Sequence, residues 1–99
     1  MDKDKIKQLM GYRLTSFRNH IGVSQRKFTE LIGYSKISIS RWESGSAFIP
    51  TEAIITISSI YGEQYYEYFN PFKKGPESHF EKQESTQKTP ELEPVSEQN

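Results

Sequence analysis

The chain has 99 residues, of which 33% are hydrophobic, and its 13 basic residues are balanced by 13 acidic ones. Such a chain forms one domain at most, with a modest core and little room for a substrate pocket. It contains no cysteine, no cluster of histidines and no apolar run near the roughly 20 residues of a membrane span, which excludes disulfides, thiolate metal sites and membrane helices.

The first predicted element is an amphipathic helix over residues 4–20. Its apolar residues recur at three- and four-residue steps, the spacing of a buried stripe: Ile6, Leu9, Met10, Leu14 and Phe17. Gly22 is a typical stop for this helix. Arg18 lies near the edge of the stripe, and the residues alone favour a solvated position for its side chain.

A second, shorter helix is predicted after Ser24, which is suited to cap it. Phe28 and Ile32 take the i, i+4 positions that face inward. Arg26 and Lys27 fall in the first turn, where the helix dipole prefers acids. They either serve solubility or favour a phosphate at that helix end, and the residues leave both readings open.

A third helix is predicted over residues 36–43, with Ser35 as its cap. At about 100° per residue, its side chains separate into two halves. Ile39 and Trp42 lie in the half that anchors to the preceding helices. The other half is expected to face outward with hydrogen-bond donors and one isoleucine: Lys36, Ile37, Ser40 and Arg41. The exposed isoleucine is either ordinary surface scatter or, the reading we favour, suited to a thymine methyl in the major groove.

A fourth helix is predicted to begin at Thr51, directly after Pro50. Its expected buried stripe is Ile54, Ile57, Ile60 and Tyr61, and Gly62 is expected to end it.

Residues 63–69 predict a short fifth helix, and residues 61–72 hold six of the 13 aromatic residues. These rings either form a lid over the small core, with Tyr65, Phe69 and Phe72 on one side, or form a contact between two copies of the chain. Tyrosine suits such a contact because it offers apolar area and a polar tip. The residues expected in a homodimer contact are Tyr65, Tyr66, Tyr68 and Phe69.

The composition changes after residue 72. Residues 73–99 contain only Phe80, Leu92 and Val95 as sizeable apolar side chains, so we expect a disordered polar tail after a single domain at residues 1–72. The charges are also unevenly placed, because the stretch from residue 13 to residue 41 holds six basic side chains against one acid. A local basic surface is therefore expected despite the neutral total.

Several segments at fixed spacing carry a resemblance to a known family: GVSQ at 22–25, GYS at 33–35, ISRWESG at 39–45, and Pro50. They make residues 10–69 similar to the lambda-repressor/Cro type of helix-turn-helix domain, also called the XRE family. The resemblance implies an all-α, compact bundle of five helices whose third helix lies in the major groove of double-stranded DNA.

The resemblance also implies roles for individual residues. The positions that reach base edges or nearby phosphates are the same outward half of the third helix, namely Lys36, Ile37, Ser40 and Arg41. Gln25 is expected to contact phosphate, and the remaining expected phosphate contacts are Arg26, Lys27, Arg13 and Ser35. Arg18 and Glu43 are expected to form an ion pair between the first and third helices.

These patterns predict a sequence-specific regulator of transcription, a dimeric repressor of phage or mobile-element type that occupies an inverted repeat. We expect it in the bacterial cytoplasm or nucleoid, without cofactor or metal. The alternative is an antitoxin or adaptor whose C-terminal segment binds a protein partner. An enzyme is disfavoured, because no nucleophile, base and orienting group recur at useful spacing.

Overall fold

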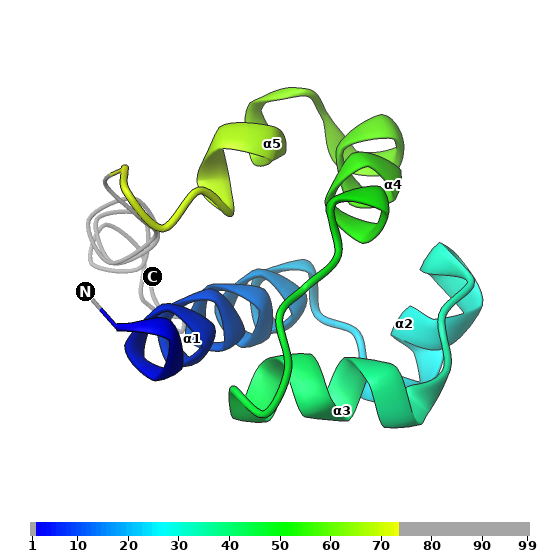
Figure 1. The fold of residues 1–99 in the computed structure, drawn as a ribbon. Coiled ribbons are helices and arrows are strands. Elements are labelled where there is room, and N and C mark those ends of the chain that lie inside the picture. The colour runs from blue at the N-terminus through cyan, green and yellow to red at the C-terminus, as the bar shows by residue number, and fades with distance from the viewer. Residues whose placement is uncertain (1, 74–99) are drawn as a thin grey trace, which may run out of the picture.

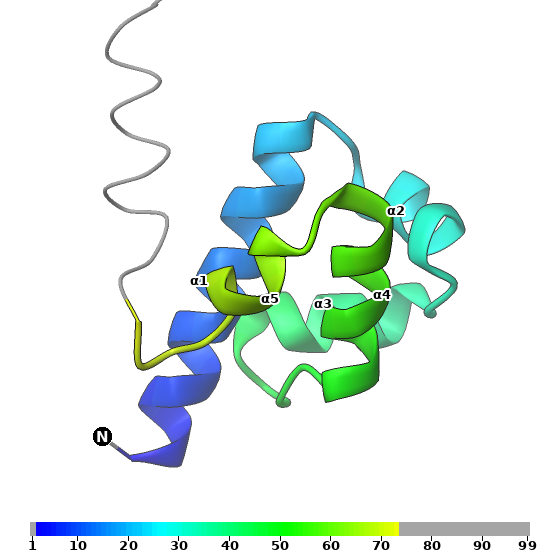
Figure 2. The same cartoon turned by 90° about the horizontal axis from the view of Figure 1, so that it is seen from above.

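A computed structural model describes residues 2–73, and within that range the chain forms five helices and no strand (Figure 1). The helices are α1 (Lys3–Ile21), α2 (Gln25–Ile32), α3 (Lys36–Ser44), α4 (Thr51–Tyr61) and α5 (Gln64–Tyr68). In Figure 1, α4 and α5 lie above α1 and α3, and α2 lies at one end. Figure 2, seen from above, shows α4 in front of α3. The predicted all-helical class is confirmed. Apart from Lys73, the predicted tail lies outside the described residues, and so does the alternative of a partner bound through it.

Local capping signals explain where the first three helices begin and end. The side chains of Asp2, Ser24 and Ser35 accept hydrogen bonds from backbone N–H groups three residues later, which satisfies donors that a helix start leaves unpaired. Gly33 ends α2 with φ of 78°, a left-handed conformation that glycine adopts without steric cost. The turn from α2 to α3 is therefore set by Gly33 and Ser35, as predicted.

The core is centred on Phe17 of α1, which is fully buried. Its ring meets Tyr61 and Tyr65 edge to face, at centroid distances of 5.2 Å and 4.8 Å, an arrangement that aromatic rings prefer. Burial also raises the pKa of the Tyr61 phenol above its ordinary value of 10.0. The other fully buried large side chains are Phe28, Phe69, Leu14, Ile39 and Ile57, and Ile32 and Trp42 are buried as predicted.

Two predicted core positions are wrong. Ile60 is 48% exposed and Phe72 is 76% exposed. The buried face of α4 is completed instead by Ala53 and Ser58, whose hydroxyl donates to the Ile54 carbonyl at 2.8 Å and so is satisfied inside the fold. The buried stripe on α4 is thus rotated toward two small residues.

The aromatic segment mainly covers the core. Phe69 is fully buried, so its predicted place in a contact between two copies is wrong. Tyr65 and Tyr68 are partly buried against the core, and Tyr66 is 50% exposed. The lid reading therefore holds for Phe69 and Tyr65. Tyr68, which that reading did not include, also packs against the core, while Tyr66 presents half of its surface outward.

The close packing of α1 on α3 depends on Gly11. A Cβ placed there would lie 2.7 Å from the Glu43 carbonyl oxygen and still closer to that of Trp42. Real Cβ atoms do not approach backbone so closely, so a side chain at this position would push the two helices apart. The approach brings the end of α3 beside α1, where Arg18 can reach Glu43. Within residues 2–73, no helix has both the length and the apolar character needed to cross a membrane.

Candidate nucleic-acid interface

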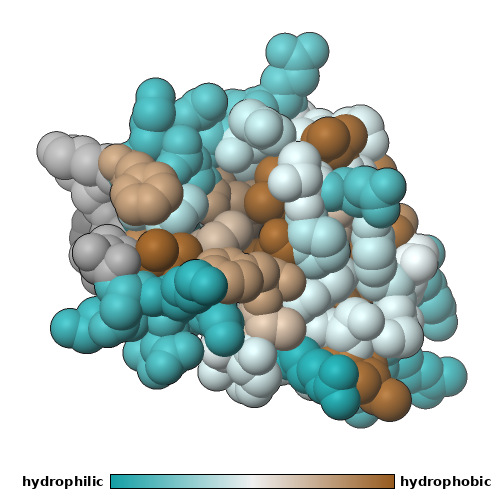
Figure 3. Space-filling model, in the orientation of Figure 1, coloured by the Kyte–Doolittle hydropathy of each residue, from teal (hydrophilic) through white to brown (hydrophobic). Residues whose placement is uncertain are grey.

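The outward half of α3 is exposed as the helical angles predict. Lys36, Ile37 and Arg41 are exposed, Ser40 is half-buried, and Ile37 keeps 66% of its surface accessible. The inward half, with Ile39 and Trp42, lies in the core. Figure 3 shows hydrophobic atoms flanked by strongly hydrophilic groups at the lower right, where α2 and α3 meet.

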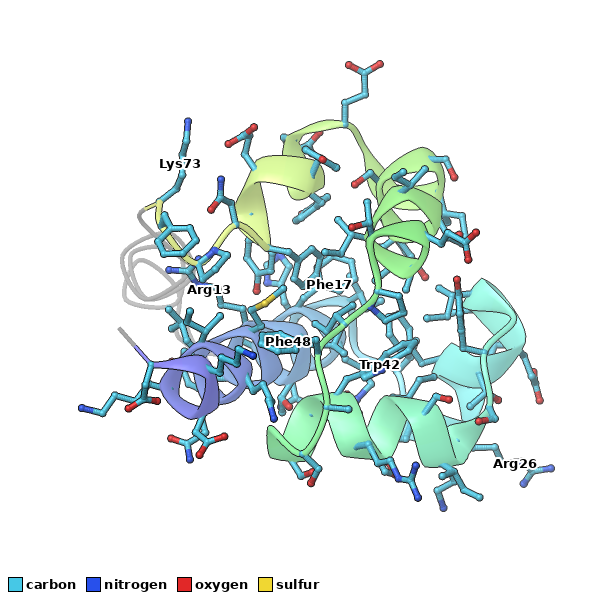
Figure 4. The ribbon with its side chains drawn as sticks, in the orientation of Figure 1. Arg13, Phe17, Arg26, Trp42, Phe48 and Lys73 are labelled. Atoms are coloured by element: carbon cyan, nitrogen blue, oxygen red, sulfur yellow. The ribbon has the colours of Figure 1, made fainter. Side chains whose placement is uncertain are left out.

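The start of α2 adds two more cations beside this surface. Arg26 and Lys27 are exposed in its first turn, and Figure 4 shows Arg26 pointing away from the body of the molecule. Lys27 Nζ lies 3.5 Å from Glu30 Oε1, and both side chains are 58% exposed. Such an exposed pair contributes little, so Lys27 stays available to another anion.

These cations form one surface, which we call the basic face: Arg26, Lys27, Lys36 and Arg41, with Ile37 among them. Within residues 2–73, no ion pair involves Arg26, Lys36 or Arg41. Their positive charge is therefore not neutralised by the described part of the chain.

Ser35 lies at the turn next to the basic face but is occupied by the helix cap. Its Oγ accepts from the Ser38 backbone N–H and donates to Ser38 Oγ, both at 3.1 Å. It is exposed, and any phosphate contact by its hydroxyl would compete with the second of these bonds.

The ion pair expected from the resemblance is present. Arg18 Nε donates to Glu43 Oε2 at 2.6 Å and Nη2 donates to Oε1 at 3.1 Å, and the two side chains are 14% and 7% exposed. Arg18 Nη1 also donates to the Val23 carbonyl at 2.8 Å. One guanidinium thus joins the end of α1, the start of α2 and the end of α3, and the solvated reading of Arg18 is wrong.

Gln25 and Ser40 extend this pair into a larger network. Gln25 Nε2 donates to Glu43 Oε1 at 2.9 Å, and the Ser40 hydroxyl donates to Gln25 Oε1 at 3.0 Å. We call Arg18, Glu43, Gln25 and Ser40 the Glu43 network. Gln25, which was expected to contact phosphate, is therefore hydrogen-bonded to Ser40, which was expected to contact bases. The sequence alone did not predict this bond.

Arg13 does not belong to the basic face, and its predicted phosphate contact is wrong. It is 3% exposed, and its guanidinium donates to the carbonyl oxygens of Asn70 and Lys73. In return, the Tyr68 hydroxyl donates to the Arg13 carbonyl at 2.7 Å. Figure 4 shows Arg13 and Lys73 toward the end of the molecule opposite Arg26. Arg13 instead fastens the segment after α5 to the middle of α1.

The chain matches no protein-family model, no curated protein and no solved structure.

Away from the basic face, the described residues also form a hollow. Within residues 2–73, no three His, Cys, Asp or Glu side chains gather as a metal site would require. A mainly apolar hollow lies between α4 and α5, lined by Ile55, Ser58, Ser59, Glu63 and Tyr66. Glu63 supplies the single carboxylate among these residues.

Proposed function

We propose that this protein is a sequence-specific DNA-binding regulator of transcription of the lambda-repressor/Cro type. In this proposal α2, the turn at 33–35 and α3 form a helix-turn-helix, and α3 enters the major groove. The observation that carries the proposal is the basic face, where an isoleucine that is 66% exposed lies among four cations. Three of them, Arg26, Lys36 and Arg41, form no ion pair within residues 2–73, and the fourth, Lys27, has only an exposed pair with Glu30.

The chemistry of the basic face matches the two parts of a DNA surface. Cations at a helix start suit backbone phosphates, which fix the register of a protein on DNA. In the groove, a guanidinium such as that of Arg41 suits the O6 and N7 acceptors of guanine, and an aliphatic side chain such as Ile37 suits the thymine methyl.

The position of Glu43 supports the same reading. A free carboxylate on α3 would repel phosphates, but the Glu43 side chain is 7% exposed and paired with Arg18. The acid on α3 is thus turned inward, and the outward half of the helix keeps only positive and neutral side chains.

A dimer that represses by occupying an inverted repeat is part of the proposal. Ile55, Ile60 and Tyr66 on α4 and α5 are each about half exposed, at 52%, 48% and 50%. Figure 1 places α5 away from α3, so a contact through Tyr66 would leave the outward half of α3 free. Tyrosine and isoleucine supply the apolar area that such contacts need.

Selection of bound sites from random double-stranded DNA by the full-length chain tests the proposal. We expect one enriched sequence with two inverted half-sites about 10 base pairs apart, the spacing that places two recognition helices on one side of DNA. Lys5→Ala, which removes an exposed cation of α1 outside the basic face, is the matched control and should enrich the same site. Recovery of no common sequence would contradict the proposal.

A further inference from the structure

The Glu43 network has a fixed hydrogen-bond direction. A carboxylate paired with an arginine offers only acceptors, and Glu43 Oε1 already faces Arg18 Nη2 at 3.1 Å. Gln25 must therefore turn its NH₂ group toward Glu43, at 2.9 Å, and its amide oxygen away from it. The two ends of a glutamine amide have nearly the same shape, and here the carboxylate decides between them.

This orientation dictates what Ser40 does with its one proton. The Gln25 amide oxygen lies 3.0 Å from Ser40 Oγ and has no hydrogen, so the serine hydroxyl must donate to it. The remaining hydrogen-bonding capacity of Ser40 Oγ is its lone pairs. Ser40 is half-buried and lies on the outward half of α3, one turn after Lys36 and next to Arg41.

We infer that Ser40 is a specificity-determining residue that accepts a hydrogen bond from a base amino group, adenine N6 or cytosine N4. The inference rests on the proposed function, in which α3 lies in the major groove. At the corresponding places guanine and thymine present the acceptors O6 and O4, which cannot pair with an acceptor. A phosphate oxygen has no proton to donate either, so Ser40 is not a phosphate contact.

If Ser40 were a donor to DNA and not an acceptor, one atom of the Glu43 network would lose its hydrogen bond. If the Ser40 hydroxyl turned to donate to DNA, the Gln25 amide oxygen would lose the donor that it has in the described structure. The second N–H of the Gln25 amide has no partner within residues 2–73, so it can donate to a phosphate while the first stays on Glu43. Gln25 therefore uses different atoms for two tasks. Its amide nitrogen donates to the DNA backbone, and its amide oxygen holds the Ser40 proton, so that Ser40 acts as an acceptor toward DNA.

The test starts from binding-site selection with the full-length chain and with Ser40→Ala, and Ser59→Ala on α4 is the matched control. We expect Ser40→Ala, but not Ser59→Ala, to reduce the base preference at one base pair of each half-site. At that pair, the adenine or cytosine is then replaced by a base that lacks the amino group, purine or 2-pyrimidinone. The wild-type chain should bind the altered site about three- to tenfold more weakly, the value of one hydrogen bond, while Ser40→Ala should bind both sites equally.

Gln25→Leu gives an independent readout, because it removes the acceptor that holds the serine proton. The freed hydroxyl can then donate as well as accept, so the preference for adenine over guanine, or for cytosine over thymine, should be lost at the same base pair. Circular dichroism verifies that each variant stays folded.

The outcomes distinguish a failure of the proposed function from a failure of the assignment of Ser40. If the wild-type chain enriches no sequence, the proposed function fails and the inference fails with it. If a site is enriched but Ser40→Ala changes no position, or if loss of the base amino group weakens the wild type and Ser40→Ala equally, the inference alone is overturned.

Discussion

Exposed cations of the basic face are expected to act differently according to the helix that carries them. Arg41 lies on the outward half of α3 and is exposed. Arg41→Ala should therefore reduce the preference for the selected site over random DNA by about 1–3 kcal/mol, the value of a good side-chain contact to a base edge. Titrations of both DNAs at one salt concentration measure it, and an unchanged ratio of the two affinities would contradict a base contact by Arg41.

Lys27 should show the complementary behaviour, because it lies at the start of α2 and its pair with Glu30 is exposed. Lys27→Ala should weaken binding to the selected site and to random DNA nearly equally, and should lower the slope of log K against log salt by about one. Binding measured at several salt concentrations gives this slope. A loss confined to the selected site would assign Lys27 to base reading instead.

At the scale of secondary-structure elements, the packing of α1 on α3 holds in position the helix that carries Lys36, Ile37 and Arg41 of the basic face. Gly11→Ala would set a methyl group against the carbonyls of Trp42 and Glu43. We expect a loss of about 1–3 kcal/mol in the free energy of unfolding, the usual cost of overpacking. Urea unfolding measures it. A matched control is Thr15→Ala, a half-buried position on the same helix, and equal losses in both variants would contradict a steric origin.

The ion pair between Arg18 and Glu43 also holds α1 and α3 together. Glu43→Ala leaves a largely buried guanidinium without its carboxylate, so the free energy of unfolding should fall by about 3–5 kcal/mol. The double variant Arg18→Met, Glu43→Leu removes both charges and should recover most of this loss. Urea unfolding of both variants decides the matter, and a double variant less stable than Glu43→Ala would contradict the account.

The helices themselves were predictable because their signals are local. Ser24 and Ser35 act within three residues of their own position, and the outward half of α3 follows from the helical repeat. What the sequence did not reveal depends on contacts between distant segments. Arg13 looked like a free cation, yet its acceptors are 57 and 60 residues away in the chain. The bond from Ser40 to Gln25 likewise needs the approach of α2 and α3 in three dimensions.

At the scale of the whole molecule, the oligomeric state decides how the chain can read a symmetric site. Sedimentation of the full-length chain at micromolar concentration should show a dimer. Tyr66→Lys should shift the equilibrium toward monomer, because it places a charge where the proposed contact is apolar. Tyr12→Lys, at an exposed tyrosine of α1, is the control and should stay dimeric. A monomer for the unaltered chain would end the proposal of a contact through α5.

The bonds that Arg13 makes have a consequence for the order in which the molecule is completed during synthesis. The guanidinium belongs to α1, which is synthesised before the other described helices, but its acceptors are the carbonyls of Asn70 and Lys73, at the end of the described residues. Until these residues emerge, burial of Arg13 would leave a charged group without hydrogen-bond partners, which is unfavourable. The nascent domain therefore completes its packing around Arg13 only after residue 73 has been synthesised and released.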